Sequence, residues 1–245
     1  MTEVLFITAS PKKEGSASSF YLRFLKVFSG NSHSKTLPLR GKVDYDAVLQ
    51  ELDSHDTLVI SAPLYFDSIP SHLLAFLNVA EQYILSHQLS LRLYVLSNSG
   101  YPEGKQSQTH FEQYRCFCER ANITWGGGLS IGGGIMLRAM CYTIAAQLAI
   151  FLIKRMRTKT DKSVTMKDFV MDCGINVLIT FGMFAGLFRL ATAIRLGKQV
   201  SNIYTGPLLA SFLYIPAASI FMMLSALLHF TMPWKLKKKI HIHRD

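Results

Sequence analysis

The sequence contains few cysteines and opens without a signal peptide. Four cysteines occur among the 245 residues, at positions 116, 118, 141 and 173, and their spacing matches no metal site. Free thiols are typical of a reducing compartment. The opening "MTEVLFITASP" has no basic stretch and only a short apolar run. These absences argue against a secreted, disulfide-bonded domain, and we expect the N-terminal part to be cytoplasmic.

Acidic residues are scarce after Gly134. Residues 1–134 carry 11 Lys+Arg and 12 Asp+Glu, whereas residues 135–245 carry 15 and 4. The basic residues of the second part form clusters, "KRMRTKTDK" and "KLKKKIHIHR", that flank apolar runs as in membrane proteins. They are not set among the polar and aromatic residues of a nucleic-acid groove, so no nucleic-acid partner is expected. We assign the terminal "HIH" to the basic tail, and no metal site is expected.

The first half alternates short strand-like runs with helical patterns. Continuous apolar runs at residues 4–7, 57–62 and 91–97 predict strands buried on both faces, which requires a parallel sheet covered by helices on each side. Residues 34–39 predict a weak strand that Pro38 confines to an edge or an end, and residues 127–134 predict the last strand. Five strands that alternate with helices predict an α/β fold, a flavodoxin-like doubly wound five-stranded parallel sheet.

The second half contains three apolar runs, at residues 135–153, 174–188 and 206–232. The last run has no Asp, Glu, Lys or Arg in 27 residues, more than the roughly 20 residues that cross a bilayer. The first run holds Arg138 and fits either the last helix of the domain or a membrane segment.

We therefore predict three parts in the chain. A domain at 1–153 is followed by a basic linker at 154–173 and an all-α hydrophobic hairpin with a basic tail at 174–245. In this interpretation the hairpin is transmembrane and contacts membrane lipid, with the N-terminal domain on the cytoplasmic side of the cell membrane. A hydrophobic dimerisation subdomain is the alternative.

The loop "TASPKKEGSASSF", at residues 8–20, joins the first strand to the first helix. Backbone N–H groups at a helix N-terminus, together with serine hydroxyls, can hold an anion such as a phosphate. Gly15 would let the backbone come close to it. Serine-rich turns before helices are, however, most often simple N-caps, so both interpretations remain open at this point.

A second loop, "SAPLYFDSIPSHLLAFL", follows the strand at 57–62. In a doubly wound sheet the loops after the first and third strands face the same crevice. Pro63, Tyr65 and Phe66 could form a flat apolar wall there, suited to an aromatic ring system. The alternative is that the two aromatic residues only cap the end of the strand.

These loops resemble those of a known family. "ASPKKEGSAS", "SAPLYFDSIPSHLLAFL" and "SNSGYPEG" (residues 97–104) are similar, in the same order, to three loops of the flavodoxin-like NAD(P)H-dependent FMN reductases and NAD(P)H:quinone oxidoreductases. The resemblance covers about residues 1–135. It implies that FMN is held by three groups of residues. The phosphate would contact Ser10, Lys12, Ser16 and Ser18, and the ring with its ribityl chain would contact Pro63, Leu64, Tyr65 and Phe66. The other edge of the ring would contact Asn98, Ser99, Gly100 and Tyr101.

Two positions depart from the family pattern. Ala9 stands where the family usually has glycine, which raises the question of whether the backbone has room there or needs a positive φ. Lys12 stands where arginine is usual, and it keeps the charge but loses the bidentate fork. The cysteine cluster that holds an iron–sulfur centre in some relatives is absent from the sequence, so that cofactor is not expected.

The resemblance implies an enzyme that transfers hydride from NAD(P)H to FMN and onward to a quinone-like or other small electron acceptor. The flavin carries this chemistry, so no catalytic side chain is predicted, and we expect His33, His55, His72, His87 and His110 to be solvated. The family also implies that two chains can pair as a homodimer. Two alternatives remain: an electron carrier or flavin-binding module that serves a membrane partner, and a membrane-interaction protein whose domain has lost its cofactor.

Overall fold

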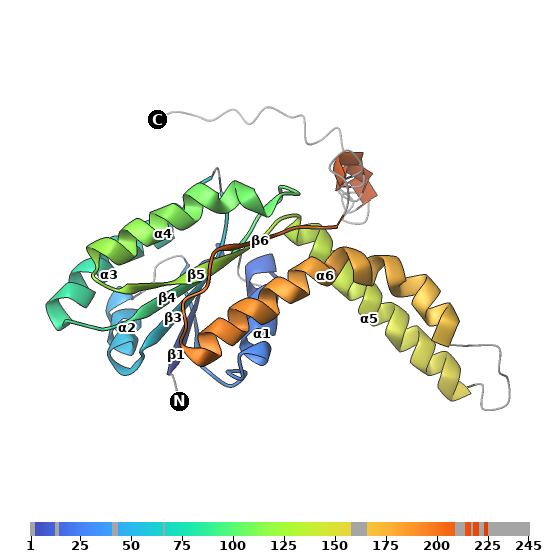
Figure 1. Ribbon diagram of the computed structural model, residues 1–245, viewed down its shortest axis with the longest axis horizontal. Coiled ribbons are helices and arrows are strands. Elements are labelled where there is room, and N and C mark those ends of the chain that lie inside the picture. Colours follow the sequence, from blue (N-terminus) through green and yellow to red (C-terminus); the bar gives the residue numbers. More distant parts are fainter. Residues whose placement is uncertain are drawn as a thin grey trace. The chain divides into compact units, whose positions relative to one another are not determined.

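The computed structural model describes residues 3–12, 15–40, 44–65, 67–157, 166–208, 214–216, 218–220 and 223–224. The chain divides into a large unit, residues 1–208, and a second unit, residues 209–245. Figure 1 shows the fold of the large unit. Most of the apolar run at 206–232, which the sequence assigns to the membrane, lies outside the described residues.

The large unit contains a six-stranded parallel sheet in the order β2-β1-β3-β4-β5-β6. In chain order the strands are β1 (Val4–Thr8), β2 (Thr36–Pro38), β3 (Thr57–Pro63), β4 (Arg92–Asn98), β5 (Thr124–Ile131) and β6 (Ile203–Thr205). The doubly wound α/β fold is confirmed, as is the edge position of Pro38 in β2. The count of five strands was one too low, because β6 is only three residues long and its sequence, "IYT", gives little signal.

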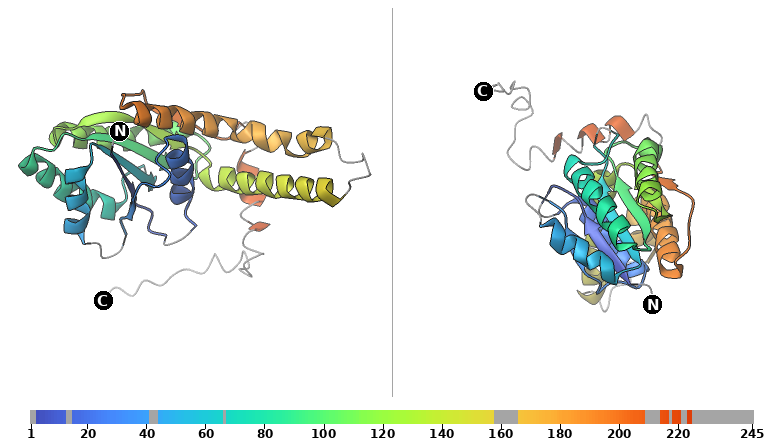
Figure 2. Two further views of the ribbon diagram at one scale, coloured as in Figure 1. Left: turned by 90° about the horizontal axis from the view of Figure 1, so that it is seen from below. Right: turned by 90° about the vertical axis from the view of Figure 1, so that its left-hand side faces the viewer.

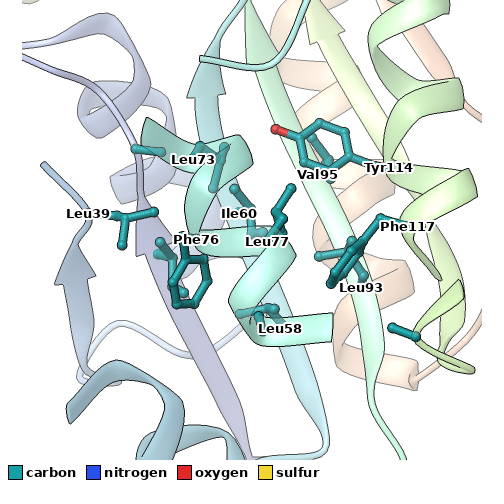
Figure 3. Packing of buried hydrophobic residues seen from close by; sticks show 14 of the residues in the cluster. Leu39, Leu58, Ile60, Leu73, Phe76, Leu77, Leu93, Val95, Tyr114 and Phe117 are labelled. Atoms are coloured by element: carbon teal, nitrogen blue, oxygen red, sulfur yellow. The ribbon is translucent and has the colours of Figure 1, made fainter. Parts of the chain in front are cut away.

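Helices cover both faces of the sheet. They are α1 (Ala17–Phe28), α2 (Tyr45–Gln50), α3 (Ser71–His87), α4 (Gln108–Arg120), α5 (Gly134–Arg157) and α6 (Met166–Leu196), with short 3₁₀ turns at Glu51–Ser54 and Gly104–Ser107. On one face α2, α3 and α4 bury apolar side chains against the strands; Figure 3 shows Phe76 and Leu77 of α3 and Phe117 of α4 beside Leu58 and Leu93. On the other face α1 and α6 form a second core with the strands.

Helix α6 belongs to the large unit, which differs from the predicted division at residues 153 and 173. It begins at Met166, inside the predicted linker, and its second half packs on the sheet. The hydroxyl of Tyr94 in β4 donates to the carbonyls of Ala193 and Lys198, at 3.1 and 2.8 Å. Six side chains of this half are buried, namely Met183, Leu187, Leu190, Ala191, Ala193 and Ile194, and so is Ile179 just before it. Packing on the sheet therefore explains the apolar sequence of this segment as well as a membrane location would.

Helix α5 and the first half of α6 run side by side and extend beyond the sheet (Figure 2). We call residues 142–156 of α5 and 170–181 of α6 the arm. Large apolar side chains are exposed along it: Tyr142, Leu148, Ile150, Leu152, Ile153, Met156, Val170, Ile175, Val177, Leu178 and Phe181. By length and composition, Gly134–Met156 and Cys173–Leu196 could each cross a membrane. The first of these was the segment that the sequence left undecided.

Two glycines of α6 provide a test of its packing. A Cβ added at Gly186 would lie 2.8 Å from a methyl carbon of Leu129 and 2.9 Å from one of Thr205, whereas at Gly182 the nearest atom is a backbone oxygen at 3.8 Å. We expect Gly186→Ala to lower the free energy of unfolding by about 1–3 kcal/mol, because the buried Leu129 must move. Gly182→Ala should instead raise it by up to about 1 kcal/mol through helix propensity. Urea unfolding of both variants in detergent measures this, and equal effects would contradict the packing.

Candidate functional site

The loops that follow β1, β3 and β4 form one pocket at the carboxyl end of the sheet, with a volume of about 200 Å³. We call it the loop pocket. Ten of the twelve residues predicted from the sequence line it, together with Gly15, Ala17, Ile135 and Arg138; the ten are Ser10, Lys12, Ser16, Ser18, Pro63, Leu64, Tyr65, Asn98, Ser99 and Gly100. Tyr101 does not line it and is exposed. Phe66 lies outside the described residues. The role of these residues as FMN ligands remains a prediction.

The N-terminus of α1 forms the floor of the loop pocket. Gly15 has φ of +60°, a conformation that favours glycine, and it turns the chain into the helix. Ser16 is the N-cap, and its hydroxyl accepts a hydrogen bond from the amide of Ser19 at 3.1 Å. The first amides of a helix have no carbonyl partner within it, so those of Ala17 and Ser18 are available to an anion. The N-cap and the anion-site interpretations are therefore both compatible with this loop.

The hydroxyls of Ser16 and Ser18 each donate a hydrogen bond within the protein. Ser18 is buried and donates to Oδ1 of Asn98 at 2.7 Å, and Ser16 donates to the hydroxyl of Ser19 at 2.8 Å. Their protons are thus used within the protein. The Ser18–Asn98 bond connects the loop after β1 to the end of β4, which fixes two walls of the pocket relative to each other. The main hydrogen-bond donors that the N-terminus of α1 could offer a phosphate are therefore its backbone amides.

Two cationic side chains line the loop pocket. Lys12 is exposed on the loop after β1. Arg138 comes from the second turn of α5, and its guanidinium donates to the carbonyl of Gly15. Among the described residues that line the pocket, none is acidic. Helix amides and two cations without a carboxylate form a donor set suited to a dianionic phosphate.

Ala9 does not disturb the loop. Its side chain is fully buried and does not line the pocket, and its φ is not positive. Its amide donates to the carbonyl of Ser61 at 2.8 Å and so continues the pairing of β1 with β3. Its carbonyl is 3.0 Å from Nε2 of His72. The substitution of alanine for the family's glycine therefore requires no backbone strain.

Comparisons with known proteins were made for the whole chain. No family model and no curated protein matches it. Solved structures do. An NADPH-quinone reductase from P. pentosaceus is 18% identical over 54% of this chain and 85% of its own, with a TM-score of 0.45. An azoreductase from Bacillus anthracis is 13% identical over 80% and 100%, with a TM-score of 0.46. General stress protein 14 from Treponema denticola, solved with FMN, is 14% identical over 53% and 86%, with a TM-score of 0.45.

The similarity to these structures concerns the fold alone. Their identities and TM-scores are low. The assignment of function therefore depends on the residues of this chain.

The side of the loop pocket that is formed by the loops after β3 and β4 is apolar, and it carries no side chain at Gly100. Pro63 and Leu64 end β3, and Tyr65 beyond them is 47% exposed. Gly100, on the loop after β4, has no atom within 4 Å of the place where a Cβ would be. A planar ring can approach such a wall closely. The pocket therefore combines donors suited to an anion at the helix with an apolar surface at its open side.

Among the described residues, no histidine lines the loop pocket. The expectation that all are solvated was wrong for His110, which is completely buried on α4. Burial lowers the pKa of His110 to about 4, so its ring is neutral at physiological pH. It packs edge-on to Tyr114, which belongs to the core.

Sequence reasoning missed the two residues of the pocket that lie outside the three loops, Ile135 and Arg138. Both stand at the start of α5, more than 100 residues after the first loop, and reach the pocket because β5 ends beside β4. The available signal was the charge itself. Arg138 is the only Asp, Glu, Lys or Arg between Ile135 and Ile153, and an isolated charge in an apolar run marks a functional position by default.

Proposed function

We propose that this protein is an FMN-dependent NAD(P)H oxidoreductase, attached to a membrane, that reduces a quinone-like or other small acceptor. The observation that carries the proposal is the convergence of three separate loops on one pocket that offers phosphate donors at one end and an apolar wall at the other. Its coarser part, a flavodoxin-like oxidoreductase fold, agrees with the solved structures to which the chain is similar.

In this proposal each side of the pocket has one task. The amides of Ala17 and Ser18, with Lys12 and Arg138, would hold the phosphate. Pro63, Leu64 and Tyr65 would bury one face of the ring system, and Ser99 and Gly100 would border its edge. When bound, FMN supplies a ring that accepts hydride from a nicotinamide and passes electrons on. The protein provides orientation, excludes water, and holds its loops in register through the Ser18–Asn98 bond.

The arm supports attachment to lipid. Its exposed apolar side chains extend over more than one face, since Ile150 and Leu152 are two residues apart and so point in nearly opposite directions around α5. A flat protein partner covers one face, whereas lipid covers all of them. Lys154 and Arg155, exposed near the end of α5, complement anionic headgroups. We propose that the sheet domain lies on the cytoplasmic side.

A lipid-soluble acceptor fits the position of the pocket relative to the arm. Ile135 lines the loop pocket and belongs to the same helix, α5, as the arm. Its side chain is 48% exposed, and with Tyr65 it gives the pocket an apolar rim. An acceptor dissolved in lipid beside α5 would thus have a short path to the flavin. This arrangement favours a quinone over a soluble, charged acceptor.

Turnover measurements test the proposal. We expect full-length protein in detergent, supplied with FMN, to oxidise NADPH or NADH when a quinone or ferricyanide is present. Apo protein without FMN is the control and should show no oxidation. If FMN binds but no acceptor supports oxidation, the protein is an electron carrier instead. If FMN does not bind, the proposal fails.

A further inference from the structure

A second pocket lies between α1 and β2, with a volume of about 600 Å³. We call it the α1–β2 pocket. It shares Gly15 with the loop pocket, so the two are adjacent across this one residue. Its lining comprises Thr8, Gly15, Ser19, Leu22, Arg23, Lys26, Thr36, Pro38 and Arg40. None of these residues is among those predicted to contact FMN.

Three of the lining residues are cations, and none of the described lining residues is acidic. Arg23 is exposed on α1, and Lys26 follows almost one turn later. In the described part of the chain, no carboxylate forms an ion pair with Arg23 or Lys26. The guanidinium of Arg40 donates to the carbonyl of Lys12 at 2.8 Å, which connects the rim of this pocket to the loop after β1.

Lys26 is held in place by the protein itself. Its ammonium donates to Oγ1 of Thr36 at 2.9 Å and to the carbonyl of Ser34, and it lies 5.4 Å from the centre of the Phe6 ring. Partial burial lowers its pKa. The groups that hold this ammonium are neutral, and in the described part of the chain no carboxylate pairs with it. An anion placed in the pocket would supply a counterion.

The charges of the N-terminal half are segregated in a way that reinforces this field. Residues 1–43 contain seven Lys+Arg (positions 12, 13, 23, 26, 35, 40 and 42) and two Asp+Glu (positions 3 and 14). Residues 44–134 contain the remaining four Lys+Arg and ten Asp+Glu. The near-neutral total therefore conceals a basic excess in residues 1–43, the part of the sequence that contains α1 and β2. This excess is larger than one FMN phosphate needs and favours a second anionic group.

We propose that the α1–β2 pocket binds the phosphorylated adenosine of a nucleotide. Its volume is much larger than a lone phosphate requires, and it combines the cations with the hydroxyls of Ser19 and Thr36 and the apolar ring of Pro38 at its exposed side. Two molecules could place such a group here and reach the loop pocket as well: NADPH, whose adenosine carries a 2′-phosphate that NADH lacks, and FAD, through its adenylate half. The NADPH assignment rests on the proposed function, because it requires the flavin site next to it.

Direct binding of adenosine 2′,5′-bisphosphate to the full-length protein, measured by calorimetry in detergent, tests the pocket without reference to turnover. We expect binding that weakens about tenfold in Arg23→Ala and further in Arg23→Glu, with partial recovery in Arg23→Lys. Arg115→Ala, which removes an exposed arginine of α4 on the other face of the sheet, is the matched control and should bind normally. Absence of binding, or equal binding by all variants, overturns the proposal.

Two further measurements distinguish the sources of the phosphate. If NADPH is the ligand, Arg23→Ala raises the KM for NADPH about tenfold and leaves that for NADH unchanged. If FAD is the ligand, the same variant weakens FAD binding and leaves FMN binding unchanged. If Arg23→Ala changes neither the KM for NADPH nor the affinity for FAD, the proposal is contradicted. If the protein binds the bisphosphate but neither binds FMN nor oxidises NAD(P)H, the proposed function is refuted, whereas the proposal for the α1–β2 pocket still holds.

Discussion

Replacing Arg138 with glutamate is expected to weaken FMN binding about a hundredfold or more. A hydrogen bond to a charged group contributes about 1.5–3 kcal/mol, and charge reversal adds repulsion from the phosphate. The substitution also removes the hydrogen bond that the guanidinium donates to Gly15, which holds the turn into α1. Quenching of FMN fluorescence during titration of the purified variant measures the dissociation constant.

Two variants of α5 serve as controls for this result. Arg138→Lys keeps the charge and should lose less affinity than the glutamate variant. Arg155→Glu makes the same charge change on the same helix, at an exposed position that does not line the loop pocket, and should bind FMN as the unmodified protein does. Equal affinity in the Arg138→Glu and Arg155→Glu variants would show that Arg138 does not contact the phosphate.

Replacing Leu152 and Ile153 together with glutamate is expected to abolish binding to vesicles of anionic lipid. Both side chains are about half exposed on the arm. Burying such a side chain in an apolar medium contributes about 1.5–3 kcal/mol, so the pair accounts for a loss of about a hundredfold or more in partitioning. Flotation of the purified protein with vesicles measures the bound fraction, and FMN affinity in detergent should not change.

A double variant of α3 is the matched control. Val79 and Leu85 are also partly exposed, at 42% and 44%, and lie on the opposite face of the sheet from α6. Val79→Glu with Leu85→Glu adds the same charge and should float normally. Loss of flotation in both double variants would point to charge alone. Normal flotation of the arm variant would contradict lipid contact by the arm, and a change in its oligomeric state would identify a second copy as the partner.

The sheet domain was predictable because its strands carry continuous apolar runs. Val4–Ile7, residues 57–62 and residues 91–97 correspond closely to β1, β3 and β4. Helix α6 was harder, since an apolar helix reads the same in a sequence whether lipid or a sheet covers it. What identifies it as a core helix is its contact with Leu129 and Thr205 at Gly186, which depends on β6. Strand β6 itself is too short to recognise.

The site was predictable only to the level of which loops meet. Pro63 and Asn98 follow from their place at the strand ends, as parallel strands end at the same edge. The use of the Ser18 hydroxyl by Asn98 depends on contacts 80 residues apart in the sequence, and no pattern near Ser18 records it. The same applies to Arg138. Its charge was visible in the sequence, but its position beside Gly15 depends on the fold.

Titration of the purified full-length protein with FMN shows whether the loop pocket binds the flavin. We expect saturable quenching of FMN fluorescence and a shifted flavin absorption band, with saturation at a single FMN per chain. Both signals should be much reduced in Arg138→Glu and unchanged in Arg155→Glu. If the protein leaves FMN fluorescence and absorption unaltered at all concentrations, the loop pocket is not a flavin site.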